Sequence, residues 1–329
     1  MPELPEVETI RQDLERRVVG RRLAGAEVSW ERTVGRPDLA AFVRGLVDRQ
    51  ITAVGRRGKY LVLGLDNAAA LVVHLRMTGR LRWREAGAAR DRHLRALLFL
   101  DDGHELHFED QRKFGRLYLA ADAAALAHVL ADVGPEPLAE TFSPDRLRAL
   151  LAGRRAMLKP LLLDQRFVAG LGNIYVDEAL FRARLHPLRR SDTLTPREVT
   201  RLHQGIVAAL QQGVTNRGTT LASYRDAWGT AGQNQERLLV FRQESKPCPR
   251  CGAPIAKIRV AGRGTHLCPK CQPLPGVRGQ APGVSGDTLT ALASQRLART
   301  ARPPGSGLAA ADRGSPRTAA GQDLLIPDP

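Results

Sequence analysis

Four cysteines constrain the fold of this chain more tightly than any other feature of its sequence. They form two Cys-x2-Cys pairs separated by sixteen residues, and the 329-residue chain contains no others. This spacing brings four thiolates to one tetrahedral Zn²⁺ ion and leaves no open coordination position for a substrate. In an intracellular chain, clustered cysteines indicate a metal site before disulfides. The sequence therefore predicts one structural Zn²⁺ ion held by Cys248, Cys251, Cys268 and Cys271.

The residues between the two cysteine pairs predict a β-hairpin. Residues 255–260 and 265–267 have the composition of strands, and Ala261-Gly262-Arg263-Gly264 provides the turn between them. An Arg on a glycine-flanked tip is well placed to bind a phosphate. His266 is an alternative zinc ligand, but four thiolates suffice, and we expect His266 on the hairpin surface.

The charge of the chain indicates a polyanionic partner. The formal net charge is +16 and the isoelectric point is near 10.8, which favours nucleic acid first and an acidic membrane second. Arg supplies most of the positive charge, which suits bidentate phosphate contacts, although a genome rich in G and C would produce the same bias. No apolar run is long enough to cross a bilayer. We therefore expect a cytoplasmic protein that binds nucleic acid.

Residues 274–329 differ in composition from the rest of the chain. They are rich in Pro, Gly, Ala and Ser and contain no aromatic residue, which predicts a disordered tail. The tail holds six Arg and four Asp, so most of the positive charge belongs to the residues before it.

The N-terminus, Met1-Pro2-Glu3-Leu4-Pro5-Glu6, carries the first candidate catalytic groups. It does not have the composition of a signal peptide, and a small second residue favours removal of Met1, which leaves Pro2 with a free secondary amine. An α-amino group titrates near ~8, so part of it is neutral and nucleophilic at physiological pH. Glu3 and Glu6 stand beside it as proton donors or acceptors. The alternative is that Pro and Glu simply begin a helix, and residue types alone favour that alternative.

Hydrophobic periodicity predicts an N-terminal helix followed by a β domain. Apolar residues recur at helical spacing from Leu4 to Val18, and Gly20 follows them. A helix over 122–133 and a Pro-rich linker over 134–138 end the domain. The short alternating runs between them predict a sandwich or barrel, with strands over 26–30, 51–55, 60–65, 70–75, 80–83, 93–100, 105–109 and 116–119.

The sequence after the 134–138 linker predicts helices. Ser143-Pro144 and Thr195-Pro196-Arg197-Glu198 are helix starts with a polar cap and Pro at the first helical position. Gly170 and Gly172 break the helical pattern, and Asn173 begins the next helix, whose free N–H groups suit a phosphate. A plain helix-turn-helix corner is the alternative reading of this Gly-x-Gly pair.

Several segments resemble, in chain order, the formamidopyrimidine-DNA glycosylases. They are Pro2 to Glu8, the Gly58-Lys59-Tyr60-Leu61 element, the long stretch 154–180 and the cysteine hairpin, so the resemblance runs from Pro2 to about Gln272. It implies a multidomain α+β fold. We expect an N-terminal β-sandwich with an N-terminal helix over 1–135, a helix-two-turns-helix domain over 136–244, a zinc finger over 245–273 and the tail.

The resemblance also implies an activity. In this family the N-terminal Pro is the nucleophile that excises oxidised purines. We therefore expect a base-excision-repair glycosylase and abasic-site lyase that acts through a Schiff base at Pro2 and then by β,δ-elimination. Its partner would be double-stranded DNA with oxidised bases or abasic sites, bound by a monomer. Lys59 becomes a second catalytic candidate beside Glu3, with Glu6 as a supporting carboxylate.

A DNA wedge follows from the same resemblance. Without it, Met77 and Phe114 would be ordinary core residues and Arg112 a surface charge. With it, the three side chains fill the hole left by the everted nucleotide, and Arg112 pairs with the orphaned base. Eversion costs a few kcal/mol, which inserted side chains must offset.

Further DNA contacts are implied residue by residue. Arg263 would grip the backbone beside the flipped nucleotide and so belongs to both the catalytic and the binding set, and a loop near 221–240 would cap the lesion. One departure is visible, because Asp91 stands where the family often has His. The remaining DNA-binding candidates are His74, His93, Lys159, Asn173 and, more weakly, Arg154.

Two alternative functions stay open. A sister branch, the endonuclease VIII enzymes, prefers oxidised pyrimidines. A zinc-ribbon protein that binds damaged DNA without cutting it is the alternative outside enzymes.

Overall fold

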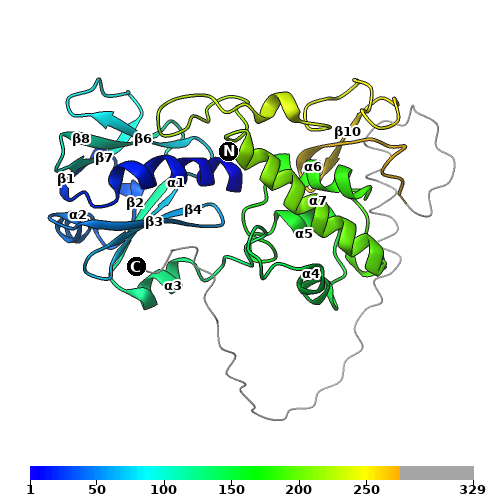
Figure 1. The fold of residues 1–329 in the computed structure, drawn as a ribbon, viewed down its shortest axis with the longest axis horizontal. Coiled ribbons are helices and arrows are strands. Elements are labelled where there is room, and N and C mark those ends of the chain that lie inside the picture. Colours follow the sequence, from blue (N-terminus) through cyan, green and yellow to red (C-terminus); the bar gives the residue numbers. More distant parts are fainter. Residues whose placement is uncertain (275–329) are drawn as a thin grey trace, which may run out of the picture.

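The computed structural model describes residues 1–274. Apart from Leu274, the predicted tail over 274–329 lies outside the described residues. Figure 1 shows two lobes, with the N-terminus at their junction. Strands and helix α1 (Leu4–Val18) form one lobe, and helices with a hairpin form the other.

Two sheets form the N-terminal β-sandwich. The larger has the strand order β2-β9-β5-β4-β3, and the smaller has the order β1-β7-β8-β6. Neighbouring strands are antiparallel except β2 and β9, which are parallel. The strands are β1 (Leu23–Val28), β2 (Val34–Arg36), β3 (Ile51–Arg57), β4 (Tyr60–Leu65), β5 (Ala70–His74), β6 (Gly79–Glu85), β7 (Leu94–Leu100), β8 (His104–Asp110) and β9 (Arg116–Ala120).

Helix α1 belongs to the cores of both lobes. Its apolar stripe from Val7 to Val18 joins the cluster of buried side chains from both sheets. Leu4, in the first turn, belongs instead to the core of the helical lobe. Because one amphipathic face serves two cores, the residues just before Leu4 lie where the lobes meet.

The second lobe consists of helices with the predicted caps. Ser143 Oγ accepts a hydrogen bond from the Arg146 N–H at 3.1 Å, and Thr195 and Glu198 form a capping box. Helices α6 and α7 pack against each other and bury their apolar faces. The helices are α4 (Pro144–Leu151), α5 (Leu158–Leu163), α6 (Asn173–Ala183) and α7 (Pro196–Thr215), followed by the hairpin strands β10 (Ala256–Val260) and β11 (Arg263–Leu267).

The fold class is confirmed, and a few element predictions differ from the structure. Helix α2 (Leu39–Leu46) was not predicted, although Asp38 caps it by accepting a hydrogen bond from the Ala41 N–H at 2.9 Å. Helix α3 (Ala123–Val129) ends four residues earlier than predicted. Short 3-10 turns occur at Glu31–Thr33, Ser191–Thr193 and Asn234–Arg237. Within residues 1–274, every helix is too short or too polar to cross a membrane.

Candidate active site and nucleic-acid interface

Glu3 connects the start of α1 to the start of α6. Its Oε2 accepts hydrogen bonds from the N–H groups of Gly172 at 2.7 Å and Tyr175 at 3.4 Å, and its Oε1 accepts from Ile174 at 3.0 Å. These donors are the free N–H groups of a helix N-terminus, which favour an anion. Burial nevertheless raises the pKa of Glu3, against the lowering effect of Lys59 and the N–H groups. The site thus contains a carboxyl group that holds its proton more readily than an exposed one.

Glu6 lies one turn further along α1 and joins three segments. Its Oε2 accepts a hydrogen bond from the Glu3 N–H at 2.8 Å. Its Oε1 accepts from the Tyr175 hydroxyl at 2.8 Å and from the Thr219 N–H at 2.7 Å. Burial and the negative charge of Glu3 raise the pKa of Glu6 to about 7. This geometry fits the supporting role expected from the sequence.

Lys59 reaches the same place from the sandwich. It follows Gly58, whose positive φ of 56° turns the chain between β3 and β4. Its Nζ donates a hydrogen bond to the Leu171 carbonyl at 2.8 Å, next to the Gly172 N–H that binds Glu3. Burial lowers the pKa of Lys59 to about 8, although the nearby carboxylates raise it. The 171–175 turn therefore brings an acid and a weakened base together.

Pro2 is the residue directly before this carboxyl group. It is buried, whereas Met1 is 49% exposed. While Met1 is attached, the nitrogen of Pro2 is an amide and has no nucleophilic lone pair. Removal of the exposed Met1 would place a secondary amine beside Glu3.

The three wedge candidates lie together on the surface of the sandwich. Met77 is 39% and Phe114 is 48% exposed, so neither is the core residue that composition alone suggests. The guanidinium of Arg112 lies 3.0 Å from the Met77 sulfur and 4.7 Å from the centre of the Phe114 ring. Large apolar side chains gathered in the open around one Arg are typical of a surface that inserts into a partner.

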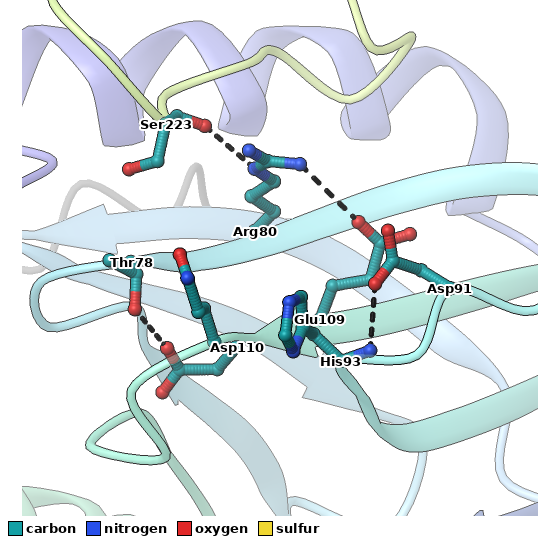
Figure 2. A pocket seen from close by; sticks show the side chains of 8 residues that line it. Thr78, Arg80, Asp91, His93, Glu109, Asp110 and Ser223 are labelled. Carbon is teal, nitrogen blue, oxygen red and sulfur yellow. Dashed lines mark hydrogen bonds and ion pairs between the residues drawn. The ribbon is translucent and has the colours of Figure 1, made fainter.

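His74 and His93 differ in their environment. His74 is buried, its Nδ1 accepts a hydrogen bond from the Arg76 N–H at 3.0 Å, and burial lowers its pKa to about 3. His93 is half-buried, and Oδ1 of Asp91 accepts a hydrogen bond from its N–H at 2.7 Å (Figure 2). Asp91 therefore orders the turn that presents His93.

Asn173 contacts the hairpin tip, which carries Arg263. The Nδ2 of Asn173 donates a hydrogen bond to the Gly264 carbonyl at 3.0 Å, next to the exposed Arg263. This contact sets the hairpin tip against the N-terminus of α6, where Glu3 also binds. Glu3 already binds the N–H groups of Gly172, Ile174 and Tyr175. The Asn173 amide and the Arg263 guanidinium are therefore the groups at this surface that suit a phosphate.

Lys159 was predicted to bind a phosphate, but in the structure its ammonium is buried against Asp177. Its side chain is 0% exposed, and Nζ donates to Asp177 Oδ1 at 2.6 Å and to the Gly264 carbonyl at 3.3 Å. The expectation that His266 lies on the hairpin surface is wrong, because His266 is buried and its N–H donates to Asp177 Oδ2 at 2.8 Å. Lys159 and His266 thus fasten the hairpin to α6 through one carboxylate.

Arg154 is exposed and lies against Phe167, with its guanidinium carbon 5.3 Å from the ring centre. Its Nε donates to the Leu150 carbonyl at 3.1 Å. Both contacts lie within the helical lobe, away from Asn173 and Arg263.

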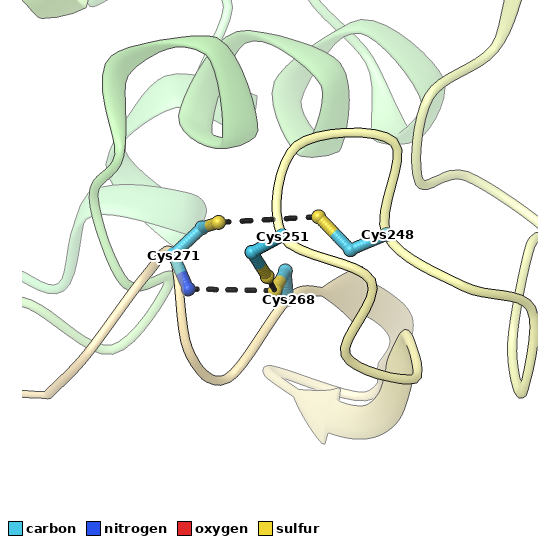
Figure 3. A group of neighbouring side chains, drawn as sticks. All are labelled: Cys248, Cys251, Cys268 and Cys271. Atoms are coloured by element: carbon cyan, nitrogen blue, oxygen red, sulfur yellow. Dashed lines mark hydrogen bonds between the residues drawn. The ribbon is translucent and has the colours of Figure 1, made fainter.

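The four cysteines gather into one cluster (Figure 3). Their sulfur atoms all lie within 4.8 Å of one another. The Cys248–Cys271 and Cys251–Cys268 sulfur distances are 3.9 and 3.5 Å, which suits four thiolates around one tetrahedral Zn²⁺ ion. The residues present therefore fit the predicted structural zinc.

Sequence reasoning missed two residues that organise the site. The Tyr175 hydroxyl joins Glu6 to Thr219, with its oxygen 3.0 Å from Thr219 Oγ1. Glu136, in the predicted linker, accepts a hydrogen bond from the N–H of Gly58 and another from Arg56 at 2.9 Å, so it fixes the turn that carries Lys59. The only signal for Glu136 was an acidic residue placed between two prolines.

Three known families match most of the chain. Residues 1–117 match the formamidopyrimidine-DNA glycosylase N-terminal domain, residues 133–224 match the formamidopyrimidine-DNA glycosylase H2TH domain, and residues 245–274 match the zinc finger found in FPG and IleRS. A formamidopyrimidine-DNA glycosylase of Pelotomaculum thermopropionicum is 48% identical over 273 residues, covering 83% of this chain and 99% of its own. One from Symbiobacterium thermophilum is 47% identical over 312 residues, covering 93% and 99%.

Solved structures of formamidopyrimidine-DNA glycosylases are also similar to this chain. The Lactococcus lactis Fpg in complex with abasic-site DNA is 38% identical with a TM-score of 0.77, covering 82% of this chain and 99% of that one. The wild-type Lactococcus lactis Fpg bound to DNA that contains N7-benzyl-Fapy-dG is 39% identical with a TM-score of 0.77, covering 83% and 100%. Both structures hold DNA.

Proposed function

The chain belongs to the formamidopyrimidine-DNA glycosylase family, and from this premise we propose that it excises oxidised purines from double-stranded DNA and then cuts the strand at the resulting abasic site. The observation that carries this proposal is the meeting of Pro2, Glu3 and Lys59 at the 171–175 turn. Nucleophile, acid and base come from three separate segments, and each is placed by specific contacts.

The chemistry begins with removal of Met1. The lone pair of the Pro2 nitrogen attacks C1′ of the everted nucleotide, and the bond from C1′ to the base breaks. The departing base takes up the proton that the Pro2 nitrogen loses. Glu3 donates a proton to the sugar oxygen as the ring opens, which leaves an iminium between Pro2 and C1′. The raised pKa of Glu3 suits a proton donor near neutral pH.

Strand scission follows from the iminium. The cationic nitrogen makes the proton on C2′ acidic, and its removal expels the 3′ phosphate; a second elimination expels the 5′ phosphate. Lys59, whose pKa is lowered to about 8, exists partly as the neutral amine and assists these proton transfers. Water then hydrolyses the iminium and frees Pro2.

The DNA is held by surfaces on both lobes. Met77, Arg112 and Phe114 enter the duplex where the damaged nucleotide leaves it, and Asn173 with Arg263 binds the backbone. Zn²⁺, bound by the four cysteines, cross-links the base of the hairpin and so keeps its tip in place. His74, His93 and Arg154 are further DNA contacts in this proposal. Lys159 acts indirectly, by holding Gly264.

The proposed domain division is that expected from the sequence. Residues 1–135 form the catalytic sandwich, 136–244 the helix-two-turns-helix domain with a lesion-capping loop near 221–240, and 245–273 the zinc finger. The matched families and the separate buried clusters of the lobes support these boundaries. The enzyme would act as a monomer on cytoplasmic, nucleoid DNA, because one chain contains every group named above.

Borohydride reduction tests the catalytic step. A duplex with 8-oxoguanine should become covalently attached to the protein on reduction, and Pro2→Gly should abolish the adduct. Damaged-DNA binding without any adduct would instead indicate the non-catalytic zinc-ribbon protein. Faster release of thymine glycol than of 8-oxoguanine would indicate the endonuclease VIII type.

A further inference from the structure

The segment from Thr219 to Thr230, proposed to cap the lesion, is fixed at both ends. At its start, the Thr219 N–H donates to Glu6 at 2.7 Å. At its far end, Asp226 accepts a hydrogen bond from Arg217 at 2.7 Å, and the Ala227 carbonyl accepts one from the Trp83 N–H at 3.0 Å. These contacts tie both ends of the segment to the groups around α1 and β6.

The tip of this segment, residues 221–223, is held differently. Ala222 is exposed, and the neighbouring Leu221 and Ser223 are half-buried. Arg80 on β6 connects this tip to the sandwich, because its Nε donates a hydrogen bond to the Ser223 carbonyl at 2.6 Å (Figure 2). Within the segment, Arg225 Nη1 donates a longer hydrogen bond to the Ala222 carbonyl, at 3.4 Å. A guanidinium bound to a carbonyl is a charge-assisted hydrogen bond, which is stronger than a neutral one.

Arg80 also has a second partner within reach. Its Nη1 lies 3.8 Å from Oε2 of Glu109, beyond hydrogen-bond distance. Glu109 is 4% exposed, and within residues 1–274 this Oε2 atom accepts no hydrogen bond. Arg80, Glu109 and Ser223 line one small cavity of about 30 Å³ (Figure 2). Arg82 Nη1 pairs with the other oxygen of Glu109, Oε1, at 3.4 Å. A buried carboxylate oxygen without a donor is costly, so Oε2 favours movement of the Arg80 guanidinium towards it.

We propose that Arg80 is a positioning residue that sets the place of the 221–223 tip, by exchanging between the Ser223 carbonyl and Glu109. This inference rests on the proposed function, because the tip matters only if the segment covers an everted base. With Arg80 on Ser223 the tip is held in one place; with Arg80 on Glu109 the tip is released. A held tip contributes to excision of a base and contributes nothing at an abasic site, where no base remains to be covered.

Two measurements on the full chain test this inference. The first is hydrogen exchange of the amides in 219–225 without DNA, and the second is single-turnover excision of 8-oxoguanine compared with incision of an abasic site. Arg80→Met should speed the exchange and slow base excision about tenfold, the loss expected for one charge-assisted hydrogen bond, while abasic-site incision changes less than about twofold. Arg84→Met is the matched control, because Arg84 lies on the same face of β6 opposite Glu105 and should change neither quantity.

Glu109→Gln tests the same change of partner in the opposite direction. Loss of the competing carboxylate should keep Arg80 on Ser223 and slow hydrogen exchange of the amides at the tip. Unchanged hydrogen exchange of residues 219–225 in both variants would overturn the proposal. Equal slowing of base excision and of abasic-site incision by Arg80→Met would do the same. If the wild-type protein cut abasic DNA and released no base, the proposed function would fail, whereas the exchange result would still decide the role of Arg80.

Discussion

Glu3 Oε2 accepts a hydrogen bond from the Gly172 N–H at 2.7 Å although the two residues are 169 positions apart in the chain. This contact closes the junction between the two lobes next to Pro2. A single carboxyl group therefore caps α6, bridges the lobes and faces the proposed nucleophile. Its structural and chemical roles are partly separable. An amide oxygen can replace one carboxylate oxygen as a hydrogen-bond acceptor, whereas the amide NH2 neither accepts a hydrogen bond nor supplies an acidic proton.

Glu3→Gln should abolish most base excision and keep the fold. Excision of 8-oxoguanine in single turnover should fall by about 100-fold or more, as expected for loss of a general acid. Glu15→Gln is the control on the same helix, since Glu15 pairs with Arg11 at the surface, away from the 171–175 turn. Excision by Glu3→Gln at the wild-type rate, with the same melting temperature, would remove Glu3 from the mechanism.

Glu6 should make the stability of the protein fall as the pH rises. Its pKa is raised from 4.5 to about 7 in the folded state, so folding favours the protonated form. The stabilisation is complete below about pH 4.5 and is lost as the pH rises through about 7, a change of roughly 3 kcal/mol in the free energy of unfolding. His74 and His186, whose pKa values burial lowers to about 3 and about 4, change the total stability in the opposite direction over part of this range. The decline is therefore expected in the difference between the wild-type and Glu6→Gln free energies of unfolding, measured with denaturant at several pH values. A difference that does not change with pH would remove Glu6 as the source of this dependence.

Lys159 provides a test between a structural role and direct phosphate binding. Lys159→Met leaves the buried carboxylate of Asp177 without its cation, which should cost about 3–5 kcal/mol of the free energy of unfolding. The double variant Lys159→Met with Asp177→Asn removes both charges and keeps an acceptor for the His266 N–H. It should recover most of the stability and bind abasic-site DNA with nearly wild-type affinity. A stable double variant that binds DNA weakly would restore Lys159 as a phosphate ligand.

The sequence predicted best those features that depend on spacing alone. The apolar stripe from Leu4 to Val18 and the two Cys-x2-Cys pairs each lie within one element or one short module, and the structure contains both. The family resemblance also predicted that Met77, Arg112 and Phe114 lie together, which no local pattern would reveal. These three side chains come from two turns that the sheet topology alone brings together.

Long-range partners of buried charges could not be predicted. The sequence around Lys159 does not reveal that its ammonium pairs with Asp177. The position of Glu136 in a proline-rich linker does not reveal its hydrogen bonds with Arg56 and Gly58. The Lys159–Asp177 pair is separated by 18 residues and the Arg56–Glu136 pair by 80, and each forms only after separate elements have packed together. The burial of His266 was missed for the same reason, because its partner Asp177 lies on α6.

Removal of zinc should release the hairpin and leave the sandwich folded. The cysteines hold the base of the hairpin, while hydrogen bonds from Asn173 and Lys159 to Gly264 and from His266 to Asp177 hold its strands against the helical lobe. Without the metal, we expect these few contacts to be too weak to offset the chain entropy of the released module. A chelator should therefore raise hydrogen exchange in 245–273 and abolish binding to abasic-site DNA, with strand amides such as those of β4 and β5 still protected. Added Zn²⁺ should restore both. Metal-free protein that keeps its DNA affinity would show that the hairpin, including Arg263, is not needed to hold the duplex.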